Sequence, residues 1–474
     1  MLLQYLSLMR QEVSLIFIAV LVLICELTVN QRYKKVVIPI TLVLFGVHTI
    51  LGFVPFDGGK LFGGMFATSH AQALMKSVLN VGVFIILLQS VAWLKKEVNF
   101  QKSNEFLILL FSTLTGMYFM ISSGDFLMFY IGLEIASIPM AMLAAFDTFR
   151  SKSSEAGIKF LLNSALSSGI LLFGISLFYA ISGTIYFDDL PLYFSPVSPL
   201  FALGFIFFIS GLAFKMSLVP FHLWTADVYE GSPTIVTSYF SVISKGAAAF
   251  ITSILLFKVF FNQLYLWKDI IYLLSVLTMT VGNLFALRQT NIKRFLAFSS
   301  ISQAGFILLG LVNVDSLGVT AIIYFILIYI LSNLSAFGVV MAIANVTGKE
   351  EIKDYNGLYK TNPLLSLTMM LAMFSLAGIP PTAGFFSKFF LFTDAAKGGY
   401  YWLVFIAVLN TIISLYYYLL VVKAMFISPN EQPIERFRSD IYTRTALLIT
   451  VVGIFAVGIY SPIFEYIRNI IDKF

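Results

Sequence analysis

Long runs of apolar residues, separated by short polar segments, repeat along the whole chain. Each run has about 17–30 residues, which lets an α-helix cross the hydrocarbon core of a bilayer. A membrane β-barrel would instead alternate polar and apolar positions over about ten residues. The pattern predicts an all-α membrane protein with about 14 transmembrane helices. The expected spans are 13–30, 36–55, 76–94, 105–123, 125–146, 157–182, 198–220, 233–257, 269–287, 294–313, 317–345, 363–395, 400–426 and 442–468.

The composition agrees with this pattern. Of 474 residues, 59% are hydrophobic and only 11% are charged, so a soluble domain of this size could not cover its surface with polar groups. The single cysteine, Cys25, excludes an intrachain disulfide and an iron–sulfur cluster held by this chain. The first residues lack the features of a signal peptide, so we expect the first helix to be retained.

The basic residues are unevenly distributed between the two sets of loops. With the N-terminus outside, 18 Lys and Arg residues fall on the cytoplasmic side and 8 on the outer side. The cytoplasmic set includes Arg32, Lys34 and Lys35, and the outer set includes Arg10 and Lys76. Both termini are therefore expected outside. The net charge of +6 reflects membrane topology and gives no reason to expect a nucleic-acid site.

Prolines interrupt two of the spans. Pro220 breaks the seventh, and Pro380–Pro381 break the twelfth within SLAGIPPTAGFFSKFF. Because the two breaks are five helices apart, the second unit must enter the membrane from the opposite side, which makes two inverted five-helix repeats with broken helices 7 and 12. We expect N-terminal helices in 1–104, repeats in 105–258 and 269–427, and a final loop and helix in 428–474.

Four ionisable residues lie well inside apolar runs: Glu134, Lys215, Lys245 and Lys388. A central lysine costs about 2.5–3.5 kcal/mol to insert, so such residues are first interpreted as functional. Glu134 is the expected partner of Lys215. At about 4 Å and a dielectric near 20, their attraction would be about 4 kcal/mol, so opening the pair would free the lysine to lose its proton. A static ion pair, or snorkelling of the lysines to the headgroups, is the alternative.

Polar residues on neighbouring spans could line a hydrated path between Lys245 and Lys388. The same side chains could equally serve as ordinary interhelical hydrogen-bond partners. His222, just past the seventh-helix break, could relay protons or tie down the broken helix end. The candidate relay residues are His222, Ser299, Ser300, Gln303, Ser332 and Asn333.

Several motifs are absent from the sequence. It contains no strand-linked GxGxxG, no GxxxxGK[ST], no CxxC and no histidine pair at metal spacing. We therefore expect no cofactor and no metal in this chain. Its source of energy must come from partner subunits or an ion gradient.

Four segments carry a family resemblance: FYIGLEIASIP, FHLWTADVYEGSPTIVTSYFSVISKGAAAF, NIKRFLAFSSISQAGF and AGIPPTAGFFSKFFLF. They resemble the subunit N family of antiporter-like subunits in the proton-pumping NADH:quinone oxidoreductase, respiratory complex I. The resemblance implies a non-redox subunit that translocates protons through Glu134, Lys215, Lys245 and Lys388. NADH, flavin, iron–sulfur clusters and quinone would be bound by other subunits of the complex, in a bacterial inner membrane.

Two other functions remain open from the sequence. A subunit of a sodium/proton antiporter of the Mrp type would share the Glu–Lys arrangement. A structural scaffold would need static buried charges, which three lysines with one acid fit poorly. The DVYEG segment and the lysine in GFFSKF favour the subunit N family over the Mrp type.

Overall fold

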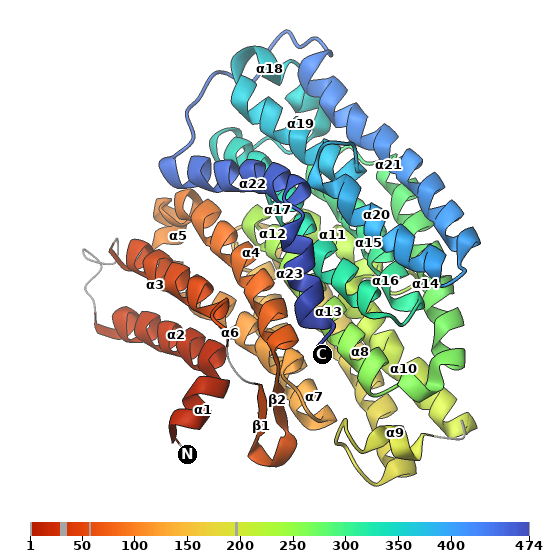
Figure 1. Cartoon of the computed structure of the whole chain (residues 1–474). Coiled ribbons are helices and arrows are strands. Elements are labelled where there is room, and N and C mark those ends of the chain that lie inside the picture. The colour runs from red at the N-terminus through yellow and green to blue at the C-terminus, as the bar shows by residue number, and fades with distance from the viewer. Residues whose placement is uncertain (1, 29–35, 56–57, 195–197, 474) are drawn as a thin grey trace.

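The structure is a computed structural model that describes residues 2–28, 36–55, 58–194 and 198–473. It is a bundle of helices with one small hairpin (Figure 1). Arg32, Lys34 and Lys35, which entered the charge count, lie outside the described residues, as do the end of the first predicted span and residues 195–197 of an expected outer loop.

A helix occupies each of the predicted spans. In the described ranges, 12 helices are long and apolar enough to cross a membrane, and shorter apolar helices fill two further spans. These segments are α2 (Arg10–Thr28), α3 (Val37–Gly52), α4 (His70–Leu94), α6 (Ser103–Ile121), α7 (Phe126–Ala144), α8 (Ser151–Ser182), α10 (Pro199–Met216), α12 and α13 (Thr234–Tyr239 and Lys245–Lys258), α14 (Leu264–Ala286), α15 and α16 (Ile292–Ile307 and Leu309–Val312), α17 (Ser316–Thr347), α19 (Pro363–Ala377), α21 (Tyr401–Phe426) and α22 (Ile441–Ile459).

Shorter elements connect these helices. They are α1 (Leu2–Leu8), β1 (Gly59–Leu61), β2 (Phe66–Thr68), α5 (Glu97–Phe100), α9 (Leu190–Tyr193), α11 (Leu223–Gly231), α18 (Leu358–Thr361), α20 (Ala383–Lys397) and α23 (Pro462–Ile471). The strands β1 and β2 pair antiparallel. The segment between the break at Pro220 and the eighth span is helical, as α11. The predicted span 442–468 is divided before Pro462, because proline starts a helix more readily than it continues one.

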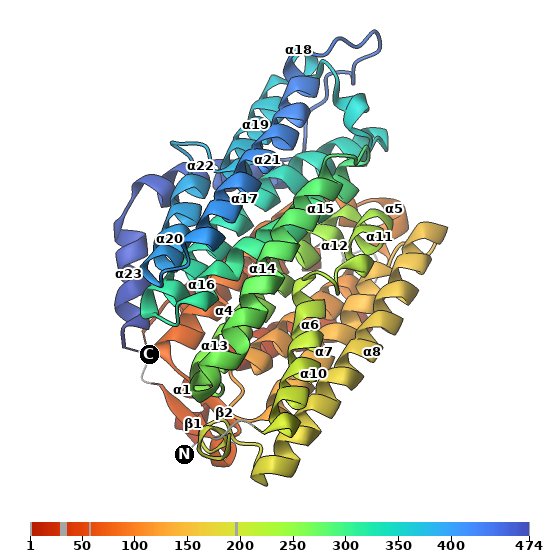
Figure 2. The same cartoon turned by 90° about the vertical axis from the view of Figure 1, so that its right-hand side faces the viewer.

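The loops separate into two groups at opposite ends of the bundle (Figure 2). At one end, Lys96 donates to the carbonyl of Asn345, and Asn291 forms a β-bridge with Glu351. At the other end, near the hairpin and the termini, Asp188 accepts from both Lys60 and Lys258. When the spans are counted from the N-terminus, the loops joined by each of these contacts fall on the same side of the membrane.

The two broken helices end in the same way. The residue after α10 is Ser217 and that after α19 is Gly378, and both have left-handed backbones, with φ of 60° and 88°. The next amide, of Leu218 or Ile379, donates to the carbonyl five residues earlier at 2.8 or 3.0 Å, which completes a Schellman motif. In each case the third residue after the left-handed position is a proline that follows a cis peptide bond. The sequences at the ends of α10 and α19 are unrelated, but the two helix ends have the same local structure.

A second feature repeats between the halves. Helices α6 and α7 approach so closely that a Cβ on Gly116 would lie 2.3 Å from the backbone nitrogen of Ala136. Helices α14 and α15 show the same close approach, because a Cβ on Gly282 would lie 2.6 Å from the nitrogen of Ser302. Small residues allow membrane helices to pack at this distance. The first two helices of each predicted repeat therefore form equivalent pairs.

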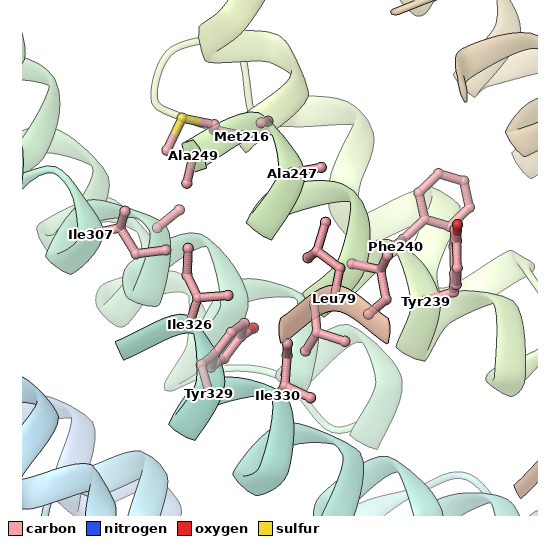
Figure 3. Packing of buried hydrophobic residues seen from close by; sticks show 14 of the residues in the cluster. Leu79, Met216, Tyr239, Phe240, Ala247, Ala249, Ile307, Ile326, Tyr329 and Ile330 are labelled. Atoms are coloured by element: carbon pink, nitrogen blue, oxygen red, sulfur yellow. The ribbon is translucent and has the colours of Figure 1, made fainter. Parts of the chain in front are cut away.

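The core lies between helices that are far apart in sequence. Leu79 of α4, Phe240 and Ala247 of the α12–α13 segment, and Ile326 and Ile330 of α17 are all buried (Figure 3). In the apolar window of α17, 94% of residues are buried, against 28% for α2 and 33% for α21. Helix α17 is thus central, and α2 and α21 are peripheral.

Candidate functional site

Lys215 lies in the last turn of α10, directly before the first break. Its Nζ donates to Ser137 of α7 at 2.5 Å and to Ser164 of α8 at 2.8 Å. The rings of Phe160 and Phe214 lie 5.8 and 5.6 Å from the ammonium group. A cation at the end of α10 also complements the negative end of the helix dipole. The lysine is therefore held by three helices and by two aromatic rings.

Glu134 is on α7, one turn before Ser137, and forms no ion pair with Lys215 within 4.0 Å. Its Oε1 is buried without a hydrogen-bond partner. Its charge nevertheless acts on Lys215 through space. The direct 4 Å contact assumed from the sequence is therefore replaced by a more distant pair, with Ser137 as the nearest partner of the lysine. Whether the two residues are functionally coupled stays a prediction.

Lys245 starts α13 immediately after a π-helical turn at Phe240–Ser244. Turns of this kind are frequent at functional sites. The side chain is 2% exposed and donates to Ser300 of α15 at 2.7 Å, and its Nζ lies 5.6 Å from the ring centre of Tyr229. Ser300 was one of the predicted relay residues, and the structure brings it into direct contact with this lysine.

Lys388 is on α20, after the second break, and reaches back to the end of α19. Its Nζ donates to the carbonyls of Leu376 and Ala377 at 3.0 and 3.1 Å, and it lies 4.7 Å from the ring centre of Phe306. Those carbonyls are among the four that a helix end leaves without internal partners. Lys215 precedes the break after α10, whereas Lys388 follows the break after α19. The two lysines therefore do not occupy equivalent positions in the two repeats.

The predicted relay residues on α15 and α17 form hydrogen bonds near Lys245 and Lys388. Ser299 pairs with the hydroxyl of Tyr418 at 2.6 Å, and Gln303 donates to the same hydroxyl at 3.2 Å. Ser332 of α17 pairs with Ser375 of α19 at 2.6 Å. All of these groups are buried and lie between α15, α17, α19 and α21.

Tyrosine hydroxyls also belong to this group of hydrogen-bonded residues, and the sequence analysis did not identify them as candidates. Asn333 donates to Ser241 at 2.8 Å, and Ser241 pairs with the hydroxyl of Tyr329 at 3.1 Å. Tyr329 also lies close to Ser300, the partner of Lys245. A tyrosine in an apolar helix resembles a packing residue in the sequence. The signal that could have identified Tyr329 is its place one turn before Asn333 on the same helix.

Two small cavities adjoin the lysines. One of about 20 Å³ is lined by Lys215, Ser137 and Met117, and one of about 10 Å³ lies between Tyr329 and Lys388. A single water needs roughly 10–15 Å³ on this measure. The hydrated path expected between Lys245 and Lys388 is therefore narrow in this conformation, because the cavity beside Lys388 has room for at most about one water.

His222 lies between the first break and α11 and is 9% exposed. Its Nδ1 is buried without a hydrogen-bond partner, so this nitrogen does not tie down the helix end. The end of α10 is instead capped by Trp224, whose indole donates to the carbonyl of Phe214 at 3.2 Å. His222 does, however, form a hydrogen bond with the backbone of Pro220 at the break. Both roles considered for His222, a proton relay and an anchor of the broken helix end, therefore stay predictions.

One assignment from the sequence is wrong. Lys76 was counted among the outer loop charges because the third span was expected to begin there. Helix α4 begins six residues earlier, where Ser69 caps it by accepting from Gln72 at 3.3 Å. Lys76 is consequently buried, and it forms an ion pair with Glu12 at 2.5 Å. Asp394 of α20 is a second buried acid that was overlooked, and it accepts from Asn313 at 3.1 Å.

The described residues contain no group of three or more His, Cys, Asp or Glu side chains that could hold a metal ion.

Comparison with known proteins assigns these features to a class. The family model described as NADH:quinone oxidoreductase/Mrp antiporter, transmembrane, matches residues 123–414. The matched region contains all four candidate charges and both helix breaks. By its description, this class comprises transmembrane proteins of NADH:quinone oxidoreductases and of Mrp antiporters.

The curated relatives are more specific. NADH-quinone oxidoreductase subunit N of Phocaeicola vulgatus is 50% identical over 462 residues, covering 97% of this chain and 98% of the relative. The protein of the same name from Azobacteroides pseudotrichonymphae is 50% identical over 465 residues, covering 97% of each chain. The chain therefore belongs to the NADH-quinone oxidoreductase subunit N family.

Solved structures share the fold. A chain of respiratory complex I from Thermus thermophilus with bound aureothin has a TM-score of 0.80 and 28% identity, covering 95% of this chain and 97% of the other. A chain of the Mrp complex from Dietzia sp. DQ12-45-1b has a TM-score of 0.87 but 21% identity, covering 99% and 97%. The similarity to the chain of the Mrp complex therefore concerns the fold alone.

Proposed function

We propose that this chain is a non-redox subunit of the membrane arm of NADH:quinone oxidoreductase and that it translocates protons, driven by quinone reduction elsewhere in the complex. Membership of the subunit N family supports the assignment of this chain to a proton-translocating oxidoreductase. NADH, flavin, iron–sulfur clusters and quinone belong to other subunits. Its partners are the other membrane and peripheral subunits, the lipid bilayer and protons.

The row of lysines inside the membrane helices is the observation that carries the proton path. Lys215, Lys245 and Lys388 each sit at a discontinuity in a helix, where backbone groups can take part in hydrogen bonding inside the membrane. Between them lie hydroxyl and amide side chains that can both donate and accept hydrogen bonds. In this role Glu134 sets the charge of Lys215, and Lys245 passes the proton on toward Lys388.

The proposal includes an arrangement in the membrane. The chain lies in the bacterial inner membrane, with both termini on the periplasmic side. Residues 105–258 and 269–427 form the two repeats, preceded by helices in 1–104 and followed by a loop and helix in 428–474. The excess of basic residues on one set of loops supports this orientation.

The experiment compares variants in the intact complex reconstituted into vesicles. Lys245→Met should leave electron transfer from NADH to an artificial acceptor unchanged and abolish acidification of the vesicle interior during quinone reduction. Ser253→Ala, a change at a buried residue of the same helix, is the matched control. Normal acidification in the Lys245 variant would remove this residue from the path.

A sodium/proton antiporter of the Mrp type is the second candidate. Its support is the likeness of fold to the Mrp complex, at 21% identity. The two functions differ in an observable way. Co-purification with peripheral iron–sulfur proteins is expected only for the oxidoreductase, and sodium-dependent proton exchange without them is expected only for the antiporter.

A further inference from the structure

A second set of buried ionisable groups lies in the N-terminal helices, apart from the lysine row. Lys76 of α4 donates to Oε1 of Glu12 on α2 at 2.5 Å and to Ser122, next to the end of α6, at 2.7 Å. The two charged side chains are 1% and 0% exposed. The second carboxylate oxygen of Glu12, Oε2, is also buried and has no hydrogen-bond partner.

An anchor between helices would not need these charges. Taking an ammonium and a carboxylate out of water costs several kcal/mol per ion, and well-packed apolar residues often replace such a pair without loss of stability. An unpartnered carboxylate oxygen adds to that cost. Ionisable residues inside membrane segments commonly mark ion or proton pathways. A functional role therefore explains the pair better than a purely structural one.

Two open cavities lie near the pair, and neighbours of the pair line them, although Glu12 and Lys76 themselves do not. One of about 340 Å³ is lined by Gln72, one helical turn before Lys76, and by Ser123, the neighbour of Ser122. The other, of about 240 Å³, is lined by Ala73 and Ser77. Gln11 separates it from the pair, since its amide donates to Ala73 and Ser77 at 3.3 and 3.0 Å. Both cavities lie at the end of the bundle that carries the hairpin and the termini.

A hydrogen-bonded cluster continues from the pair into the bundle. Asn80 follows Lys76 by one turn of α4 and accepts from the hydroxyl of Tyr118, whose ring centre lies 5.8 Å from the lysine. His48 contacts that hydroxyl at 3.0 Å and Asn80 at 3.2 Å, and its other nitrogen contacts Ser14 at 2.8 Å. The titratable groups facing the pair are thus Tyr118 from α6 and, behind it, His48 from α3.

The cluster also approaches the lysine row. Tyr118 follows Met117, and Met117 lines the cavity beside Lys215. On α12, the hydroxyl of Tyr239 contacts the sulfur of Met117 at 3.9 Å and Thr113 at 2.6 Å. The N-terminal cluster thus includes the immediate neighbour on α6 of a residue that lines the Lys215 cavity.

We propose that Glu12 and Lys76 form a proton-exchange site that connects the outer end of the molecule with the Lys215 cavity. The proposal rests on the proposed function and extends the proton path into the N-terminal helices. A proton from water in the adjoining cavities is taken up by Oε2 of Glu12, and the pair changes from neutral to one positive charge while Lys76 stays protonated. Release of the same proton restores the neutral pair, so the exchange is balanced.

The test uses the intact complex in vesicles and the double variant Glu12→Gln/Lys76→Met, which removes both charges at similar volume. A structural ion pair predicts normal assembly and normal proton translocation. The proposal predicts normal assembly, a normal rate from NADH to an artificial acceptor, and at least about a tenfold loss of proton translocation coupled to quinone reduction. Ser90→Ala, at a buried residue of the same helix, controls for altered packing of α4. Normal translocation in the double variant would overturn the proposal.

Two further variants make the outcome unambiguous. Lys388→Met in the same preparation tests the proposed function itself, so a defect there with normal translocation in the double variant rejects only the N-terminal site. If the double variant does not assemble, Glu12→Asp keeps a carboxylate at a changed distance from Lys76. The proposal then requires a shifted pH profile of proton translocation, and an unchanged profile would reject it.

Discussion

Replacement of Lys388 separates its two possible roles, because the structure shows it as both a buried charge and a cap on a broken helix. In Lys388→Met the carbonyl of Leu376 keeps a donor, Gln303, at 3.1 Å, so only the carbonyl of Ala377 loses its partner. That loss costs about 1–3 kcal/mol. Removal of a charge from the membrane interior returns about 2.5–3.5 kcal/mol. The terms nearly cancel, so we expect the variant complex to assemble.

The catalytic effect should then be large. Without an exchangeable proton at this position, quinone reduction coupled to proton translocation should fall by about 10²-fold or more. Electron transfer from NADH to an artificial acceptor should be unchanged, since the chain has no redox motif. The assay measures both rates, and the internal pH, in vesicles containing equal amounts of assembled complex.

Lys388→Arg tests whether the residue at this position must release a proton or only carry a positive charge. Arginine stays protonated even when buried, so it would keep the positive charge and could still donate to both carbonyls, but it would not release a proton. We expect translocation to be lost in this variant as well. If Lys388→Arg translocates protons normally, the lysine acts as a fixed charge at the end of α19 and the relay assignment is wrong.

Three other outcomes are expected. Glu134→Gln and Lys215→Ala should each impair turnover, and the double variant should be no worse than either, because coupled residues are non-additive; strictly additive losses in activation free energy would contradict the coupling. In cells whose protein lacks the native cysteine, an impermeant maleimide should label Leu192→Cys and leave Thr148→Cys unlabelled, and the reverse pattern would invert the topology. Hydrogen bonding by two lysines lowers the pKa of the half-exposed Asp188. Its contribution to stability, at most about 1 kcal/mol for such a surface site, is therefore present above the unfolded pKa near 3.9 and lost as pH falls through the lower folded value. Thermal unfolding of the wild-type complex and Asp188→Asn should converge at low pH, and a constant difference would contradict the ion pair.

The span pattern and the breaks could be predicted because each depends on local features. A run of apolar residues long enough to cross the bilayer has few alternatives to a helix, and Pro220 and Pro381 each lie at an interruption. The similar ends of α10 and α19 could not be predicted, since one uses serine and the other glycine at the left-handed position. Glycine alone would have been the expected residue there.

The contacts of the charged residues were harder to predict than their burial. Glu134 and Lys215 were expected to touch, but the rotation of α7 against α10 brings Ser137 to the lysine instead. Lys76 was misassigned because a polar start, HAQALMK, resembles a loop in the sequence, although it belongs to a helix inside the bundle. Its partner Glu12 is distant along the chain, and no local pattern identifies such a pair.

The central position of α17 has a consequence for how the chain is made. Its apolar window is 94% buried, and it packs against α4, which is synthesised long before it, and against α22, which is synthesised after it. Until α22 is inserted, the side of α17 that α22 covers, which includes Leu331 and Gly338, must face lipid. The packing around α17 is therefore completed only after α22 has been synthesised. Shortening the chain before α22 should produce a protein that inserts into the membrane but is rapidly degraded.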